Sequence, residues 1–104
     1  GGGGGEKWEF FCNLSAWRQK SAILKNVDKT AKWIVRDRMN NLVVFEQKVY
    51  KTGDTWVSAR FGEAYYMKAF NHLFRQINWE DKKAYSVKEL LEEYERMNNK
   101  EEKQ

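Results

Sequence analysis

The stretch from Ala31 to Phe61 limits what this chain can fold into more than any other part of the sequence. It reads AKWIVRDRMNNLVVFEQKVYKTGDTWVSARF and contains three runs rich in β-branched and aromatic residues. Residues 39–41 (Met-Asn-Asn) and 52–54 (Thr-Gly-Asp) separate the runs, and Asn and Gly tolerate the positive φ angles of tight turns. The pattern predicts an antiparallel meander of three strands.

The first turn sets which side chains share a face of this sheet. If residues 39–41 form a three-residue loop, alternation along the strands separates an apolar face from a mostly charged one. If Asn40-Asn41 is a two-residue turn, the register slips by one and both faces become mixed. We favour the three-residue loop because it leaves one clean apolar face to bury. That face then carries Trp33, Val35, Val43, Phe45 and Val49, and the opposite face carries Ile34, Arg36, Arg38, Val44, Glu46, Lys48 and Tyr50.

Two segments before the meander are candidates for further strands. Residues 7–14 (KWEFFCNL) largely alternate apolar and polar side chains, which predicts a strand with one buried face. Residues 15–30 fit either a helix with a thin apolar stripe or a strand. We favour the strand because residues 28–30 (Asp-Lys-Thr) lie where a tight hairpin loop would fall, directly before the meander.

The part of the chain that follows the meander is expected to be helical. Apolar residues at a three-to-four spacing over residues 62–77 predict a helix across the apolar face of the sheet. Ser86 and Glu89 form a capping box that predicts a second helix, ending near Asn98. The residues expected beneath the first helix are Val43, Phe45, Val49 and Val57.

These elements together predict an α+β protein, an antiparallel β-meander of four to five strands packed on one face by two C-terminal helices. Residues 6–98 are expected to form its single domain. The five glycines at 1–5 are interpreted as a linker or disordered tail. Residues 99–104 have no apolar anchor and are expected to fray.

Composition removes several classes of function. The chain has 104 residues, enough for one core, and its 15% of aromatic residues is typical of a folded domain. Its single cysteine, Cys12, rules out an intrachain disulfide and a multi-cysteine metal site. With His72 as the single histidine, Cys-His catalysis requires that Cys12 meets His72. No apolar run is long enough to span a membrane. We therefore expect a soluble, cytoplasmic protein without a cofactor and without a membrane partner.

The charged face of the meander is the candidate functional surface. The formal net charge is +4, and acidic residues concentrate after Trp79, so the positive charge belongs to the sheet-bearing part of the chain. Cations beside exposed rings suit a single-stranded nucleic acid, because phosphates pair with Lys or Arg and bases stack on aromatic rings. We predict binding of single-stranded DNA or RNA by Lys32, Arg36, Arg38, Lys48, Tyr50, Trp56 and Arg60.

A second hypothesis assigns the same surface to an acidic protein partner. Exposed rings and cations also form the hot spots of protein interfaces, so the chain is alternatively a protein-binding modulator or inhibitor. A homodimer built on this face is a variant of that hypothesis. The abundance of Lys, Asn and Glu and the absence of Pro resemble short proteins of AT-rich bacterial genomes and their phages, many of which act by binding.

A third hypothesis is a metal-dependent nuclease. Asp37 followed by Glu46-Gln47-Lys48 resembles the D…(E/D)xK core of the restriction-enzyme-like nucleases, although Arg36 stands where that core often has Pro. The resemblance implies that the two carboxylates hold a divalent metal and that Lys48 positions the attacking water. It requires Asp37 and Glu46 on one face, which the two-residue turn would provide. With the three-residue turn favoured, we expect a binding protein rather than an enzyme.

Overall fold

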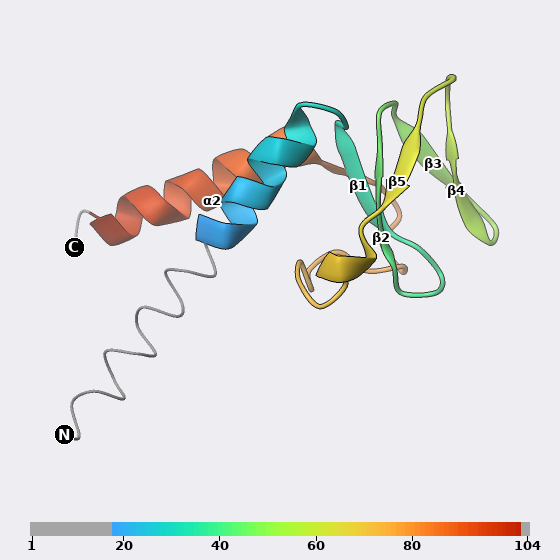
Figure 1. Ribbon diagram of the computed structural model, residues 1–104. Helices are drawn as coiled ribbons and strands as arrows, with labels where there is room; N and C mark the ends of the chain where they lie inside the picture. The colour runs from blue at the N-terminus through green and yellow to red at the C-terminus, as the bar shows by residue number, and fades with distance from the viewer. Residues whose placement is uncertain (1–17, 103–104) are drawn as a thin grey trace.

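The computed structural model describes residues 18–102 (Figure 1). The predicted strand at 7–14 and the glycines at 1–5 lie outside the described residues. A helix covers residues 18–28, and α2 (Val87–Glu102) closes the described chain. Between them lie β1 (Trp33–Arg36), β2 (Leu42–Phe45), β3 (Val49–Thr52), β4 (Thr55–Ser58), β5 (Ala64–Tyr66), the 3-10 helix η1 (Lys68–Phe70) and β6 (Tyr85–Ser86).

The strands form two antiparallel sheets, one of four strands and one of two. The four-stranded sheet has the order β5-β2-β1-β6, and β3 pairs with β4 as a separate hairpin. Figure 1 shows the two helices on one side of the four-stranded sheet and the β3–β4 hairpin on the other. The predicted α+β class with antiparallel sheets and two helices is confirmed, with one helix before the sheet and one after it.

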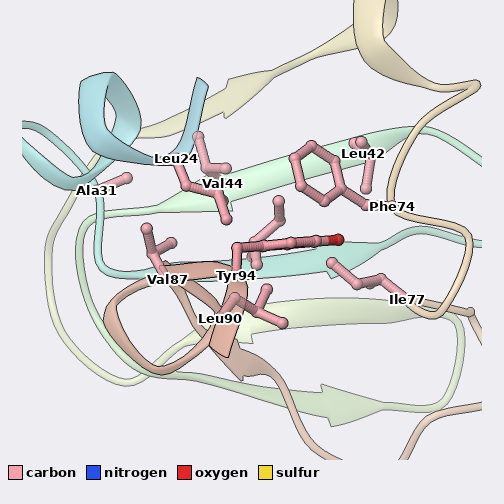
Figure 2. Close-up of a cluster of buried hydrophobic side chains, with 10 residues drawn as sticks. Leu24, Ala31, Leu42, Val44, Phe74, Ile77, Val87, Leu90 and Tyr94 are labelled. Carbon is pink, nitrogen blue, oxygen red and sulfur yellow. The ribbon is translucent and has the colours of Figure 1, made fainter. Parts of the chain in front are cut away.

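A large apolar core lies between the four-stranded sheet and the helices (Figure 2). Leu24 comes from the helix at 18–28, Leu90 from α2, and Phe74 from the segment between η1 and β6. The ring of Tyr94 meets Phe74 edge to face, with 6.2 Å between their centroids. The other buried members are Ala31, Ile34, Leu42, Val44, Ile77 and Val87.

A second core lies between the same sheet and the hairpin. Val35 of β1 and Val43 of β2 pack against Val49 of β3 and Trp56 of β4, all four of them buried. Trp79 packs against this core and meets Trp56 edge to face at 6.5 Å between centroids. Both faces of the four-stranded sheet are therefore covered, so the expectation of one solvent-exposed face is wrong.

The turn between β1 and β2 has three residues but lies one position earlier than predicted. Asp37 N–H donates to the Asn41 carbonyl at 2.9 Å, and Asn40 closes the loop with φ 69°. Trp33 therefore faces Phe45 across the strands. In the predicted loop Leu42 would pair with Arg38, whereas in the structure it pairs with Arg36, a shift of two residues. Because side chains alternate between faces, a shift of two leaves each side chain on the same face of the sheet.

Trp33, Val35, Val43 and Phe45 therefore share a face as predicted, and this face lies against the hairpin. The opposite face was expected to be open and mostly charged, but it carries Ile34, Leu42 and Val44 and is covered by the helices.

Residues 18–28 form a helix, so the preferred strand at 15–30 is wrong and the helical alternative applies to the part described. Ser21 and Leu24 are buried, and Ile23 and Val27 pack partly buried beside them. This is an amphipathic stripe at helical spacing. After the helix, Ala31 N–H donates to the Val27 carbonyl at 2.7 Å and leads the chain into β1.

The predicted helix at 62–77 is absent. The segment contains β5, then η1, then a series of turns in which Phe74 has φ 55°. Its apolar periodicity is real, because Phe74 and Ile77 are buried, but burial is reached without a continuous helix. Val57, expected beneath that helix, is 44% exposed. The predicted start of the second helix is correct, since Ser86 Oγ accepts the Glu89 N–H at 3.3 Å, and α2 extends beyond Asn98 to Glu102.

Candidate functional site

Arg36, expected on the nucleic-acid surface, is a buried structural residue. Only 2% of it is exposed, and its guanidinium donates to four carbonyl groups of one segment. The acceptors are the carbonyl oxygens of Asn71 at 2.8 Å, Leu73 at 3.0 Å, Phe74 at 3.1 Å and Ile77 at 3.0 Å. Burial, and after it the charge of Arg75, lowers the pKa of Arg36. Its donors already have protein partners and cannot reach a phosphate.

Trp56, the other residue expected at the centre of that surface, is also buried. It is 6% exposed, and its Nε1–H donates to the Arg36 carbonyl at 3.0 Å. The indole therefore connects the hairpin to β1 and has no free face for a base. The assignment of Arg36 and Trp56 to an exposed binding surface is wrong.

Three other predicted residues are exposed but do not come together. Lys32 pairs with Asp28 at 3.1 Å, at the end of the helix at 18–28. Arg38 pairs with Asp54 at 3.0 Å, between the β1–β2 and β3–β4 turns. Arg60 lies in the loop after β4, beside the fully exposed ring of Phe61. None of the three lines the cleft that contains the remaining predicted residues.

Lys48 and Tyr50 do lie together, in a cleft of about 430 Å³ that we call the lysine cleft. Tyr50 is 54% exposed, and its partner across an isolated antiparallel bridge is Lys83. Lys48 Nζ lies 5.7 Å from the centroid of the half-buried Trp33 ring, a cation–π distance. The lining consists of Trp33, Lys48, Val49, Tyr50, Lys51, Lys82, Lys83 and Ala84.

The charge of the lysine cleft is uncompensated within its lining. Four lysines and no acidic residue line it, and in the described part of the chain no ion pair involves any of these lysines. The acids nearest to these lysines in sequence are Glu46, Glu80 and Asp81, and Glu46 Oε1 accepts the Glu63 N–H at 3.0 Å. Asp81 Oδ2 accepts the backbone N–H of Asn78 at 2.9 Å, so this carboxylate is held in its own turn. The cleft therefore presents positive charge next to aromatic rings.

Lys51 has a different role from the other three lysines. Its Nζ lies 4.2 Å from the centroid of the Trp79 ring and 5.3 Å from that of Trp56, and it donates to the Trp79 carbonyl. These contacts fix the base of the cleft and connect it to the core beneath the hairpin. Lys48, Lys82 and Lys83 are exposed and remain available to a ligand.

Sequence reasoning missed Lys82 and Lys83 because it treated residues 78–85 as a polar connector. The signal that could have drawn attention to them is a pair of lysines between two aromatic residues, Trp79 and Tyr85. That pattern does not reveal its neighbour, since the contact with Tyr50 depends on a bridge between distant parts of the chain.

The residues of the nuclease hypothesis do not converge. Asp37 follows the C-terminal end of β1 and its Oδ1 accepts the Asn41 N–H at 2.8 Å. Glu46 follows β2 at the opposite end of the hairpin, and its Oε1 accepts the Glu63 N–H at 3.0 Å. By strand alternation the two carboxylates also belong to opposite faces. The geometry that the resemblance requires is therefore contradicted.

Other catalytic possibilities find no support among the described residues. Cys12 lies outside them, and His72 is exposed in the turns after η1. No group of three or more His, Cys, Asp or Glu side chains in the described part could together hold a metal ion. No helix there is both long enough and apolar enough to cross a membrane.

Comparison of the chain with protein-family models, with curated proteins and with solved structures gave no significant match.

Proposed function

We propose that this protein binds single-stranded nucleic acid through the lysine cleft. The observation that carries the proposal is the lining itself, in which four lysines and two aromatic residues share one cleft with no acidic side chain. Phosphates pair with ammonium groups, and bases of any sequence stack on exposed rings. A cytoplasmic location stays a prediction with this proposal, and it is favoured by the single cysteine, which can form no intrachain disulfide.

The cleft can hold a short stretch of nucleic-acid backbone, with an aromatic ring beside it on which a base can stack. Lys48, Lys82 and Lys83 supply mobile exposed cations, while Tyr50 presents a ring that is more than half exposed. Because the rings are few and no side-chain amide lines the cleft, the expected preference is for an unpaired strand rather than for a particular base sequence.

The test measures binding of labelled single-stranded DNA and RNA by fluorescence anisotropy at several salt concentrations. Three phosphate contacts predict a log–log slope of affinity against salt of about −2, at roughly −0.7 per contact on a single strand. Lys82→Gln and Lys83→Gln should each weaken binding and flatten the slope by roughly 0.7. Lys88→Gln, an exposed lysine of α2 outside the cleft, is the matched control and should change neither quantity.

Two outcomes would count against the proposal. Binding that Lys82→Gln and Lys83→Gln do not alter would show that the cleft is not the site. No binding at low salt would favour the alternative function, a modulator that presents the same lysines and rings to an acidic protein surface. That alternative requires a defined protein partner whose binding is lost in the Lys82→Gln variant.

A further inference from the structure

Among residues 18–102, β5 forms an edge of the four-stranded sheet that no other strand covers. It is the last strand in the order β5-β2-β1-β6, and all three of its residues are exposed. Edge strands are commonly protected by being very short, by lysine or proline residues or by a bulge, because their free backbone groups pair readily with another strand. β5 has the sequence Ala-Tyr-Tyr and contains no such residue.

The hydrogen bonds to β2 show which backbone groups of β5 point outward. Glu46 N–H donates to the Glu63 carbonyl at 3.1 Å, and Met67 N–H donates to the Leu42 carbonyl at 2.8 Å. In an antiparallel pair, hydrogen-bonded and non-hydrogen-bonded residues alternate, so Tyr65 is the residue of β5 that bonds inward to β2. The N–H and C=O groups of Ala64 and Tyr66 consequently face the open side.

We propose that β5 pairs with β5 of a second copy of this chain, antiparallel and centred on Tyr65. In this register Ala64 of each copy lies opposite Tyr66 of the other. All of the outward N–H and C=O groups of Ala64 and Tyr66 then find partners, giving four hydrogen bonds. The two four-stranded sheets join into one continuous sheet of eight strands.

Side-chain sizes match this register. Ala64 and Tyr66 lie on the hairpin face of the sheet, where both line a cleft of about 290 Å³ together with Val43 and Phe45. Each Tyr66 ring therefore crosses the small Ala64 side chain of the second copy. Tyr65 lies on the helix face, beside a mainly apolar cleft lined by Val27, Ala31, Val44 and Met67, and meets its own symmetry mate.

Charge also favours a second copy as the occupant. Glu63 precedes β5 and Lys68 follows it, and neither takes part in an ion pair within the described residues. In this register each Glu63 lies opposite Met67 of the second copy, one position from its Lys68, whose Nζ lies 5.7 Å from the centroid of the Tyr66 ring of its own copy. The three-residue edge is short compared with obligate interfaces, so we expect a dimer that forms and dissociates with concentration.

The first experiment is sedimentation equilibrium of the full chain across a wide range of concentrations. The wild-type chain should show a monomer–dimer equilibrium. Glu63→Lys and Lys68→Glu should each weaken the dimer, whereas the double variant should restore it, because the charges are exchanged rather than lost. Ala64→Pro removes one outward N–H and should abolish the dimer while leaving the circular dichroism spectrum unchanged.

The second experiment tests the register by oxidative crosslinking in a Cys12→Ser background. Tyr65→Cys places the two thiols in a non-hydrogen-bonded pair, with Cα atoms about 4.5 Å apart, which a disulfide can bridge. Tyr66→Cys is the matched control, because the two copies of residue 66 are offset by two positions, about 7 Å along the strand. A monomer at every concentration, or equal crosslinking of the two variants, would overturn the proposal.

Discussion

Trp56 donates its indole N–H to the backbone carbonyl of Arg36 at 3.0 Å, and both residues are buried. This bond connects the β3–β4 hairpin to β1 of the other sheet. From the sequence, both side chains were expected on the same open face of the sheet. The structure instead places Trp56 beneath the hairpin, while the Arg36 side chain bonds to carbonyl groups of residues 71–77.

Trp56→Phe should destabilise the fold without changing nucleic-acid affinity. It removes the donor to a buried carbonyl, a loss of about 1–3 kcal/mol in the free energy of unfolding. Urea denaturation of the variant measures the loss. Anisotropy with single-stranded DNA, recorded where the variant is folded, should match the wild type. A weakened affinity in folded protein would return Trp56 to the binding surface.

Arg36→Met should be among the most destabilising substitutions in the described chain. Four carbonyl groups of residues 71–77 lose a donor, and two of them, those of Phe74 and Ile77, are buried. Each buried group left unsatisfied costs about 1–3 kcal/mol, so we expect a loss of at least about 2 kcal/mol. Arg36→Lys should fail to rescue it, because one ammonium cannot reproduce the planar fork of a guanidinium. Loss of the folded circular dichroism signal would be the same result in its extreme form.

Arg38→Met is the control for this substitution. Arg38 is exposed and pairs with an exposed Asp54, so its removal should cost about 1 kcal/mol or less. Equal destabilisation by the two arginine variants would show that the carbonyl contacts of Arg36 contribute little to the stability of the fold.

The contacts of Arg36 also explain where sequence reasoning failed. The apolar spacing over residues 62–77 correctly marked Phe74 and Ile77 as buried, but spacing reports burial rather than backbone conformation. In a helix these carbonyl groups would accept backbone N–H groups of the following turn. Here they accept the guanidinium of Arg36, which lies 35 to 41 positions earlier in the sequence. A contact over that separation leaves no pattern in the local sequence. The apolar spacing was therefore the only signal available, and it predicts a helix.

Local signals, by contrast, were sufficient for the two turns and for the start of α2, but they did not indicate the break at residues 46–48 that places β2 and β3 in separate sheets. Runs of β-branched residues, an Asn with positive φ and a Ser-Glu capping pair each act within a few positions. Only part of the candidate site could be predicted from these local signals. Lys48 and Tyr50 lie on a predicted strand, whereas Lys82 and Lys83 join them through a bridge from a segment that was expected to be a connector.

Stability should fall at alkaline pH, in part because of Tyr85. Burial first, and then the carboxylate of Asp81, raises the pKa of Tyr85 above its ordinary value of about 10. The folded state therefore holds the phenol proton more tightly than the unfolded state does. The contribution of the Tyr85 phenol to the free energy of unfolding is fully present below about pH 10 and is lost as the pH rises through the folded-state pKa.

Tyr85→Phe tests this dependence. The variant loses the hydrogen bond to the Gln76 carbonyl, so its free energy of unfolding should be lower than that of the wild type at neutral pH. The difference between the two proteins should shrink as the pH rises above about 10, because only the wild type loses the phenol contribution. Urea denaturation at a series of pH values measures this, and a difference that stays constant would contradict the assignment.

Labelled DNA incubated with Mg²⁺ or Mn²⁺ should not be cut by this protein. Asp37 and Glu46 are held at opposite ends of the β1–β2 hairpin by backbone N–H groups, so they cannot share a metal ion. Asp37→Ala should instead lower stability by about 1 kcal/mol, through the unsatisfied Asn41 N–H. Metal-dependent cutting that is lost in an Asp37→Ala, Glu46→Ala double variant would revive the nuclease hypothesis.

Tyr50 and Val57 provide a matched pair for testing the aromatic part of the lysine cleft. They are cross-strand partners on the outer face of the hairpin, 54% and 44% exposed, and only Tyr50 lines the cleft. Substitution of either by Ala should cost about 1 kcal/mol of stability or less, as expected for an exposed cross-strand pair. Tyr50→Ala should in addition weaken single-strand binding by about 1–3 kcal/mol, and this loss should not depend on salt. Val57→Ala should leave the affinity unchanged. If the two variants bind equally well, the ring does not stack on bases, and the cleft binds nucleic acid through charge alone.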